Sequence, residues 1–236
     1  MSSVQYRRIA VIPARGGSKR LHRKALIEFE GKPLLAYTIL AALESNCFEK
    51  VVTSSDDDEI LDIASSFGSI PYKRDTALAD GLTTTAPVLI DVLQHEEKEG
   101  DSWDILACLY ATAPLRTAED ISAVVDLVEP GVCDYAMAVS QADRPVHQAL
   151  TAGADGTLDI VWPELVNLNS QAAPQYMFGN GSTYAVHTPA FLENKSLYGP
   201  GLRGHMMPRE RSVDIDTEDD LELLKYYAQT RNNPKR

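Results

Sequence analysis

Residues 9–24 read IAVIPARGGSKRLHRK, so an apolar run is followed at once by a glycine pair and a cluster of basic side chains. The apolar run Ile9–Ile12 has the composition of a buried strand. The ten residues from Arg15 to Lys24 hold five Lys or Arg, whereas the whole chain has only 22 against 34 Asp and Glu. Ligands of parallel sheets bind beyond the carboxyl ends of the strands, which is where this basic turn is expected to lie.

The basic turn has the chemistry of a phosphate-binding loop. Gly16 and Gly17 can adopt positive φ angles and let backbone N–H groups approach an anion. Several cations on one turn suit a polyphosphate, whose charges must be held and neutralised together. The alternative is a solvated basic loop, but the position after a buried strand favours phosphate binding. The segment matches neither G-x-x-x-x-G-K-[ST] nor G-x-G-x-x-G, so a Walker loop and a dinucleotide fingerprint are both excluded.

The composition limits the partners and the location of the protein. A net charge of −12 argues against general affinity for nucleic acid or for anionic membranes. No apolar stretch approaches the roughly 20 residues of a membrane span, and residues 1–8 lack the apolar segment of a signal peptide. Cys47, Cys108 and Cys133 are widely spaced without a C-x-x-C pair, so we expect reduced thiols in a cytoplasmic protein and no zinc site.

The periodicity of the chain predicts alternating strands and helices. Strands are expected at Ile9–Ile12, Val51–Ser54, Ile105–Tyr110, Tyr135–Val139, Thr183–His187 and Val213–Asp216. Helices are expected from Pro33, over Asp57–Phe67, over Thr85–Glu97, from Thr117, and from Thr217 through Ala228. Repeated β–α–β units predict an α/β fold, a mostly parallel sheet with helices on both faces, within one domain spanning residues 1–236.

The stretch 141–177 interrupts this pattern. It is rich in Gln, Ala, Asn and Pro and shows little periodicity, yet it carries large apolar side chains such as Trp162 and Tyr176. Exposed apolar groups in such number usually meet a partner surface. We therefore predict that 141–177 is an insert that forms a lid or a subunit contact, and that the protein is a homodimer.

The second feature is acidic and lies near the C-terminus, where residues 213–217 read VDIDT. In an extended segment Asp214 and Asp216 share one face, while Ile215 faces the core. Two carboxylates in this arrangement can hold Mg²⁺, which keeps several waters and bridges to substrate phosphates. The alternative is a strand end running into a helix cap. Together with the basic turn, the two acids form a coherent metal and triphosphate site.

Two further segments have both a structural and a functional interpretation. Residues 109–117 read LYATAPLRT, where Thr112 and Arg116 either contact a substrate or belong to a turn held by Pro114. Asn180 and Gly181 precede a strand and mark either a hairpin turn or a close approach to a ligand.

Six segments occur in order along nearly the whole chain. They are IPARGGSKRLHRK at 12–24, GKPLLAYTI at 31–39, VVTSSDD at 51–57, RD at 74–75, LYATAPL at 109–115 and DIDTEDDL at 214–221. As a set they resemble the acylneuraminate cytidylyltransferase family. The resemblance implies a Rossmann-like α/β fold of the nucleotide-diphospho-sugar transferase type, with a dimerisation insert. It also implies a Mg²⁺-dependent reaction in which CTP and a nine-carbon 2-keto sugar acid give the CMP-sugar and pyrophosphate.

The resemblance also implies roles for single residues. The nucleotide site comprises Arg15, Gly16, Gly17, Ser18, Lys19, Lys24, Arg74, Tyr110, Ala111 and Thr112. Arg15, Lys24, Asp214 and Asp216 are the implied catalytic groups, and the two aspartates are the implied metal ligands. Gln171, Asn180 and Gly181 are the implied sugar contacts, and the insert is expected to reach across a dimer. Arg144, Arg203 and Arg209 are open alternatives for binding the sugar carboxylate.

The chain departs from the sialic acid enzymes of that family at two places. Ala25 stands where those enzymes usually have Asn, and Tyr110-Ala111 stands where they usually have Gln-Pro. The LYATAPL segment is more similar to pseudaminic acid cytidylyltransferases, whereas Asn180-Gly181 is more similar to the sialic acid enzymes. Another base, an eight-carbon keto sugar acid, and a catalytically silent nucleotide- or sugar-binding homologue remain alternatives.

Overall fold

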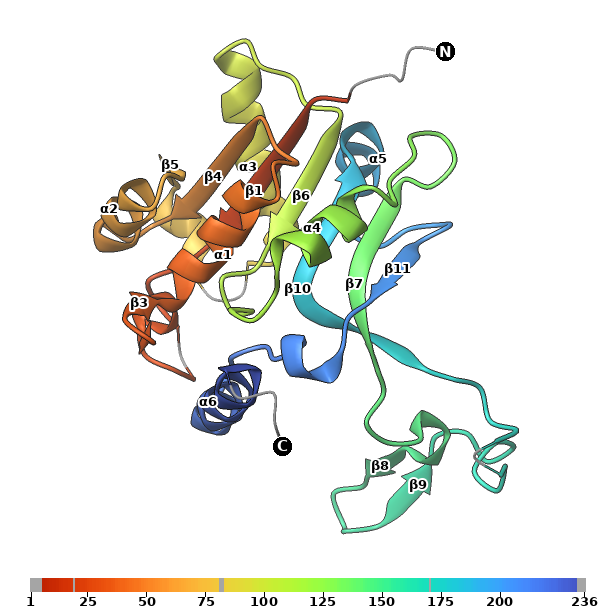
Figure 1. Ribbon diagram of the computed structural model, residues 1–236. Coiled ribbons are helices and arrows are strands. Elements are labelled where there is room, and N and C mark those ends of the chain that lie inside the picture. The colour runs from red at the N-terminus through yellow and green to blue at the C-terminus, as the bar shows by residue number, and fades with distance from the viewer. Residues whose placement is uncertain (1–5, 19, 81–82, 170, 233–236) are drawn as a thin grey trace.

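A computed structural model describes residues 6–18, 20–80, 83–169 and 171–232 (Figure 1). Its strands are β1 (Arg8–Pro13), β2 (Glu28–Phe29), β3 (Lys32–Pro33), β4 (Lys50–Ser55), β5 (Ile70–Lys73), β6 (Ile105–Leu109), β7 (Tyr135–Gln141), β8 (Leu150–Ala152), β9 (Leu158–Ile160), β10 (Met177–His187) and β11 (Arg203–Met206). Its α-helices are α1 (Leu34–Glu44), α2 (Asp58–Ser66), α3 (Thr85–Lys98), α4 (Ala118–Val125), α5 (Thr188–Asn194) and α6 (Glu218–Asn232). Short 3-10 helices lie at Lys24–Leu26, Thr76–Ala79, Val146–Gln148 and Arg209–Arg211.

A seven-stranded sheet forms the centre of the molecule, with the order β11-β7-β10-β6-β1-β4-β5. The strand β1 lies inside the sheet and pairs in parallel with its neighbours β4 and β6. The strand β10 runs antiparallel to both β6 and β7. The predicted mostly parallel sheet is therefore confirmed, with β10 as its antiparallel member.

The two faces of the sheet are covered by different helices (Figure 1). Ala10 and Ile12 of β1 belong to a core cluster that includes residues of α1, α2 and α4. Ile9 and Val11 point to the other face and pack with residues of α3 and α5. Because both faces of β1 are buried, its sequence is apolar without alternation, which is the pattern of a central parallel strand.

Polar side chains at the helix starts explain where several helices begin. Asp57 caps α2 by accepting hydrogen bonds from the backbone N–H groups of Glu59 and Ile60. Thr117 and Asp120 form a reciprocal capping box at α4. These helices start where the sequence predicts them. The sequence did not predict β5, β11 and α5, because the first two are short edge strands without apolar alternation and α5 has only seven residues.

The predicted strand Val213–Asp216 is wrong. The segment is extended but pairs with no strand of the described chain. The Ile215 N–H donates a backbone hydrogen bond of 2.8 Å to the carbonyl of Thr112, in the turn after β6. Ile215 is fully buried, in a cluster with Leu21, Leu115 and Leu224 that packs α6 against the basic turn. The acids on either side of Ile215 are therefore fixed by packing rather than by strand pairing.

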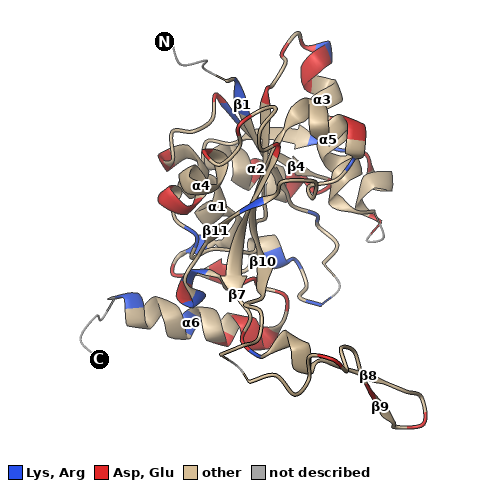
Figure 2. Ribbon diagram, turned by 90° about the vertical axis from the view of Figure 1, so that its right-hand side faces the viewer, with Lys and Arg blue, Asp and Glu red and all other residues tan. Residues whose placement is uncertain are grey.

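The insert leaves the body of the molecule as an extended arm, seen from two directions in Figures 1 and 2. Its regular part is the antiparallel pair β8 and β9. Trp162 stacks on Tyr176 with the ring centroids 6.4 Å apart. Leu150 and Leu158 are exposed to 51% and 62%. The arm thus carries apolar side chains that its own chain does not cover.

In the part of the chain that the structure describes, we find no helix with the length and apolar character that a membrane crossing requires.

Candidate active site

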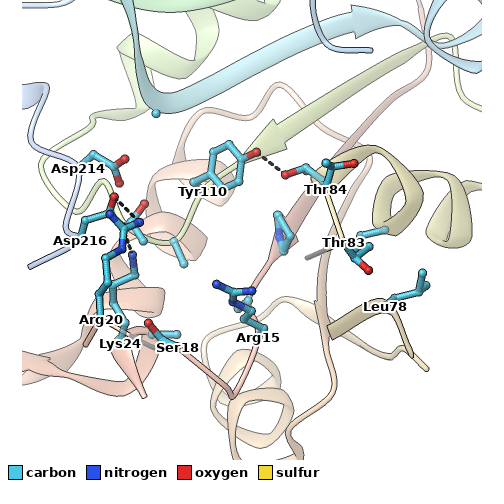
Figure 3. Close-up of a pocket in the computed structure, with 18 of the residues that line it drawn as sticks. Arg15, Ser18, Arg20, Lys24, Leu78, Thr83, Thr84, Tyr110, Asp214 and Asp216 are labelled. Atoms are coloured by element: carbon cyan, nitrogen blue, oxygen red, sulfur yellow. Dashed lines mark hydrogen bonds and ion pairs between the residues drawn. The ribbon is translucent and has the colours of Figure 1, made fainter. Parts of the chain in front are cut away.

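A cavity of about 510 Å³ opens beyond the carboxyl ends of β1 and β6 (Figure 3). Five segments far apart in the sequence line it. They are the basic turn after β1, the residues before and at the start of α3, the turn after β6, Gly181 and Tyr184 of β10, and residues 214 and 216 before α6. This is the sheet edge at which the sequence predicts a ligand site.

Three cations of the basic turn face the cavity, and two of them contact Asp216 (Figure 3). Lys24 Nζ lies 2.7 Å from Asp216 Oδ1, and Arg20 Nη2 lies 2.8 Å from Asp216 Oδ2. Burial tends to raise the pKa of Asp216, but the two cations outweigh burial and hold this pKa below its ordinary value. Arg15 forms no ion pair or hydrogen bond with any residue that the structure describes. Its guanidinium is therefore available to an anionic ligand.

Asp214 is the second carboxylate of the cavity, and its surroundings differ from those of Asp216. It is half-buried, and its Oδ1 has no hydrogen-bond partner within the described chain. Burial raises the pKa of Asp214, and a hydrogen bond with Thr112 opposes this change. A buried carboxylate oxygen without a partner is costly unless a ligand or cation satisfies it.

The two acids fit a magnesium ion that a substrate phosphate helps to hold. Within the described ranges no three His, Cys, Asp or Glu side chains cluster as a metal cage. Mg²⁺ does not need such a cage, since one or two carboxylates, waters and substrate phosphates usually complete its shell. Asp214 supplies an unsatisfied oxygen, and Asp216 lies beside the cations that would bind the phosphates.

The acidic run after β4 holds the basic turn in place. Asp56 Oδ1 accepts a hydrogen bond from Gly16 N–H at 3.1 Å. Asp57 Oδ2 pairs with Arg23 Nη2 at 2.9 Å, so Arg23 is a support of the turn. A Cβ atom on Gly16 would lie 2.8 Å from Asp57 Oδ2, whereas a Cβ atom on Gly17 would meet nothing. Glycine is therefore required at position 16 by close packing.

Arg74 brings a further cation to the cavity wall. Its side chain is 3% exposed, and its Nη2 lies 3.6 Å from Asp56 Oδ1. Burial lowers the pKa of Arg74, and the charge of Asp56 opposes this change. Arg74 Nε is buried without a partner among the described residues, so it has a donor to offer to a ligand.

The structure brings most of the predicted site residues together. Arg15, Ser18, Lys24, Arg74, Tyr110, Ala111, Thr112, Gly181, Asp214 and Asp216 line the cavity. Gly16 and Gly17 belong to the turn but are not part of the lining. Lys19 lies outside the described residues.

Two predicted sugar contacts do not lie in this cavity. Asn180 is 7% exposed, and its amide is used inside the protein. Its Oδ1 accepts hydrogen bonds from Ser182, and its Nδ2 donates to Ser212 Oγ at 3.2 Å. Gln171 is exposed on the arm. Within one chain Asn180 therefore stabilises the backbone behind the cavity wall. A sugar contact by Gln171 stays a prediction.

Several lining residues were not predicted. Arg20 belongs to the basic cluster, but the resemblance drew attention to Arg15, Lys19 and Lys24 only. Thr83 and Thr84 precede α3 and Thr85 is its first residue, and Thr85 Oγ1 lies 2.5 Å from the hydroxyl of Tyr110. The run of three threonines before an apolar helix was the available signal.

A second cavity of about 620 Å³ adjoins the first and shares Asp214 with it. Arg209 lines this second cavity. Arg203 is paired with Glu129 at 3.2 Å elsewhere on the surface. Of the three arginines considered for a sugar carboxylate, Arg209 is the one that shares a cavity with Asp214.

Solved structures share this fold. A CMP:2-keto-3-deoxy-manno-octonic acid synthetase complexed with CTP superposes with a TM-score of 0.68 at 18% identity, covering 96% of this chain and 99% of the other. A 4-diphosphocytidyl-2C-methyl-D-erythritol synthase from Anaerococcus prevotii gives a TM-score of 0.65 at 13% identity, covering 95% and 99%. At such identities these likenesses show the fold alone.

Curated relatives are closer in sequence. A pseudaminic acid cytidylyltransferase of Campylobacter jejuni is 32% identical over 92% of this chain and 94% of its own length. A CMP-N,N'-diacetyllegionaminic acid synthase of Legionella pneumophila is 33% identical over the same shares. An N-acylneuraminate cytidylyltransferase of Escherichia coli is 30% identical over 96% of this chain and 53% of its own length.

A cationic turn after a central parallel strand, with two carboxylates opposite it, defines a nucleotidyltransferase of the α/β class. A sequence model of the cytidylyltransferase family matches residues 9–153. The chain belongs to the cytidylyltransferase family and, by its curated relatives, to the acylneuraminate type.

Proposed function

We propose that this protein transfers CMP from CTP to a nine-carbon 2-keto sugar acid of the pseudaminic, legionaminic or sialic type, in a Mg²⁺-dependent reaction that releases pyrophosphate. The observation that carries the proposal is the arrangement of Lys24, Arg20 and Asp216 in one cavity with the unsatisfied oxygen of Asp214. The named relatives act on sugar acids of this class.

The reaction requires positioning and charge neutralisation rather than a protein nucleophile. The sugar hydroxyl oxygen loses its proton to solvent and forms a bond to the α-phosphorus of CTP, and the bond from that phosphorus to the oxygen bridging the α- and β-phosphates breaks. Arg15 and Lys24 hold the β- and γ-phosphates, which leave as pyrophosphate. When bound to Asp214 and Asp216, Mg²⁺ supplies charge stabilisation at the α-phosphate. Asp214 borders both cavities, so it stands between the nucleotide and a second substrate.

The sugar preference depends on Tyr110 and Ala111. In place of an amide, the cavity wall carries the ring of Tyr110, whose hydroxyl is already engaged by Thr85. A wall of this kind suits a less hydroxylated sugar acid. A site built to hydrogen-bond a hydroxyl group strongly rejects a substrate that lacks it, whereas an apolar pocket discriminates only weakly between such substrates. We therefore propose a preference for 9-deoxy diamino sugars of the pseudaminic or legionaminic type over ordinary sialic acid.

We also propose that the protein is a homodimer and lies in the cytoplasm. The uncovered apolar side chains of the arm favour a homodimer through 141–177. The three cysteines are free thiols, as is usual in a reducing compartment, and this favours a cytoplasmic enzyme.

Pyrophosphate release with each of the four nucleoside triphosphates and a panel of keto sugar acids tests this proposal. We expect release with CTP, with kcat/KM higher for the deoxy diamino acids than for N-acetylneuraminic acid. Equal or higher kcat/KM for N-acetylneuraminic acid contradicts the sugar preference. Release with an eight-carbon acid only, or with none of the acids, favours the alternative acceptor or the silent homologue.

A further inference from the structure

Residues 180–183 interrupt the pairing of β10 with β7, whereas Thr183 still pairs with Leu109 of β6. The register between β10 and β7 shifts between Gly179 and Tyr184, so this bulge has no ladder partner on the β7 side. Ser182 and Thr183 are nevertheless fully buried. Buried backbone groups outside a ladder need other hydrogen-bond partners.

Arg116 supplies one of those partners. Its Nη1 donates to the Ser182 carbonyl and lies 3.5 Å from Thr183 Oγ1. Tyr110 N–H donates to the same carbonyl at 3.1 Å. The bulge 180–183 is thereby tied to the turn after β6, which forms part of the cavity wall.

Arg116 is an unusual residue for bonding a buried backbone carbonyl, because it is itself a buried cation. Its side chain is 3% exposed, and its Nε and Nη2 have no partner among the described residues. It pairs with no carboxylate in the described part of the chain. Burial lowers the pKa of Arg116 to about 10, which leaves the guanidinium charged at neutral pH. A buried charge without a counter-ion is costly, so its retention calls for a function beyond packing.

The bulge 180–183 in turn contacts Asp214. Gly181 has a φ angle of +69°, and a Cβ atom on it would lie 2.5 Å from Asp214 Oδ2. The backbone of the bulge therefore forms the surface against which the Asp214 carboxylate rests. A displacement of the bulge would change the position of that carboxylate in the cavity.

We propose that Arg116 is a positioning residue for the metal site: by fixing the Ser182 carbonyl it holds the bulge 180–183, and through Gly181 it keeps Asp214 directed into the cavity. The inference rests on the proposed metal-binding role of Asp214. Arg116 itself does not line the cavity.

The test measures metal affinity directly, without turnover. Free Mn²⁺, used in place of Mg²⁺, is followed by electron paramagnetic resonance with a CTP analogue that carries a methylene group between the α- and β-phosphorus. Arg116→Met keeps the aliphatic length and removes the charge and the donors. Arg116→Lys keeps the charge and one donor. Gly181→Ala pushes on Asp214 from the bulge without touching Arg116.

We expect Arg116→Met and Gly181→Ala to weaken Mn²⁺ binding by about 10- to 100-fold, as loss of a supporting partner does at other metal sites. Arg116→Lys should restore part of the affinity. Val125→Ala, a buried truncation on the following helix α4, should lower Tm and leave Mn²⁺ affinity at the parent value.

Parent-like Mn²⁺ affinity in folded Arg116→Met would overturn the proposal. If Arg116→Met does not fold, parent-like affinity in both Arg116→Lys and Gly181→Ala overturns it equally. Asp214→Asn separates this result from a failure of the proposed function: if that change leaves Mn²⁺ affinity intact, Asp214 is no metal ligand and the metal site itself is misassigned.

Discussion

At the scale of single residues, Asp216 is shared between Lys24 and Arg20. The cations suited to phosphates and a carboxylate suited to a metal thus neutralise each other in the protein. A triphosphate carrying Mg²⁺ can replace both sets of contacts. Its phosphates would pair with the two cations, and its Mg²⁺ would bind the carboxylate. Arg15, which has no such partner in the described chain, is free to meet the nucleotide first.

The first prediction concerns these cations. Arg15→Ala and Lys24→Ala should each lower kcat/KM for CTP by tenfold or more, because a hydrogen bond to a charged group contributes about 1.5–3 kcal/mol. Arg15→Ala should leave Tm unchanged, since it removes no ion pair. Steady-state kinetics and thermal unfolding measure the two effects.

Arg8→Ala is the matched control, because Arg8 begins the same strand β1 and pairs with Asp126 at 3.0 Å, away from the cavity lining. It should leave kcat/KM unchanged. Near-normal turnover in both Arg15→Ala and Lys24→Ala would end the phosphate-binding hypothesis for the turn.

At the scale of elements, the turn after β1 is held by the start of α2. Gly16 packs on Asp57 so closely that a methyl group would collide, whereas Gly17 faces open space. Gly16→Ala should therefore displace the turn and lower kcat/KM by about 100-fold, the effect that a shift of about 1 Å can have on positioned groups. Gly17→Ala should stay near the parent value, and kinetic parity of the two variants would contradict this account of the turn.

The helix α4 carries a second testable contact, between Asp120 and Arg211. Asp120 is 1% exposed and accepts two hydrogen bonds of 2.8 Å from Arg211. Burial tends to raise the pKa of Asp120, but the hydrogen bonds from Arg211 and Thr117 outweigh burial and lower it. Asp120→Asn should reduce the free energy of unfolding at pH 7 by about 1.5–3 kcal/mol.

The direction of the pKa shift of Asp120 predicts how the difference in free energy of unfolding between parent and Asp120→Asn varies with pH. Because folding lowers the pKa of Asp120, its carboxylate stabilises the fold at pH values above the unfolded value of about 4. This contribution is lost as the pH falls through the lower folded value. Denaturant titrations of parent and Asp120→Asn should thus differ by a constant amount down to about pH 5 and converge below about pH 4. Asp126→Asn, at an exposed residue at the end of α4, should change the free energy of unfolding by about 0.5 kcal/mol or less.

The elements also show what the sequence can and cannot predict. Periodicity and caps predicted β1, β4, β6 and their helices, because these are buried on both faces or capped by local side chains. The edge strand β11 reads RGHM and carries no such pattern. Asp57 was interpreted only as a helix start, because its contacts with the turn after β1 join segments remote in sequence.

The same limit applies to the site. The sequence predicted that the basic turn and Asp214 with Asp216 form one site, because cations and a carboxylate-bound metal can neutralise one triphosphate together. It could not show that Lys24 pairs with an acid 192 positions away. Nor could it show that Arg116 and Asn180 lie behind the cavity wall, since their burial depends on how β10 bulges.

At the scale of the whole molecule, the arm is the part that one chain leaves incomplete. We predict a homodimer in light scattering at micromolar concentration, because the apolar side chains of the arm need a covering surface. Leu158→Glu, at a residue 62% exposed on β9, should shift the protein toward the monomer. Val132→Glu, at a residue 71% exposed and outside the arm, should not. A monomeric parent protein would refute the assembly.

In the proposed reaction the sugar hydroxyl attacks CTP at its α-phosphorus, and pyrophosphate is the leaving group. The direct measurement is ³¹P NMR of the reaction of CTP, Mg²⁺ and a 9-deoxy diamino sugar acid labelled with ¹⁸O at its C2 hydroxyl. We expect one new phosphodiester resonance with the isotope shift of a bridging ¹⁸O, together with unlabelled pyrophosphate. Formation of CDP with phosphate, or of a CMP-sugar without the label while the unreacted sugar acid still carries it, would contradict attack by the sugar hydroxyl at the α-phosphorus.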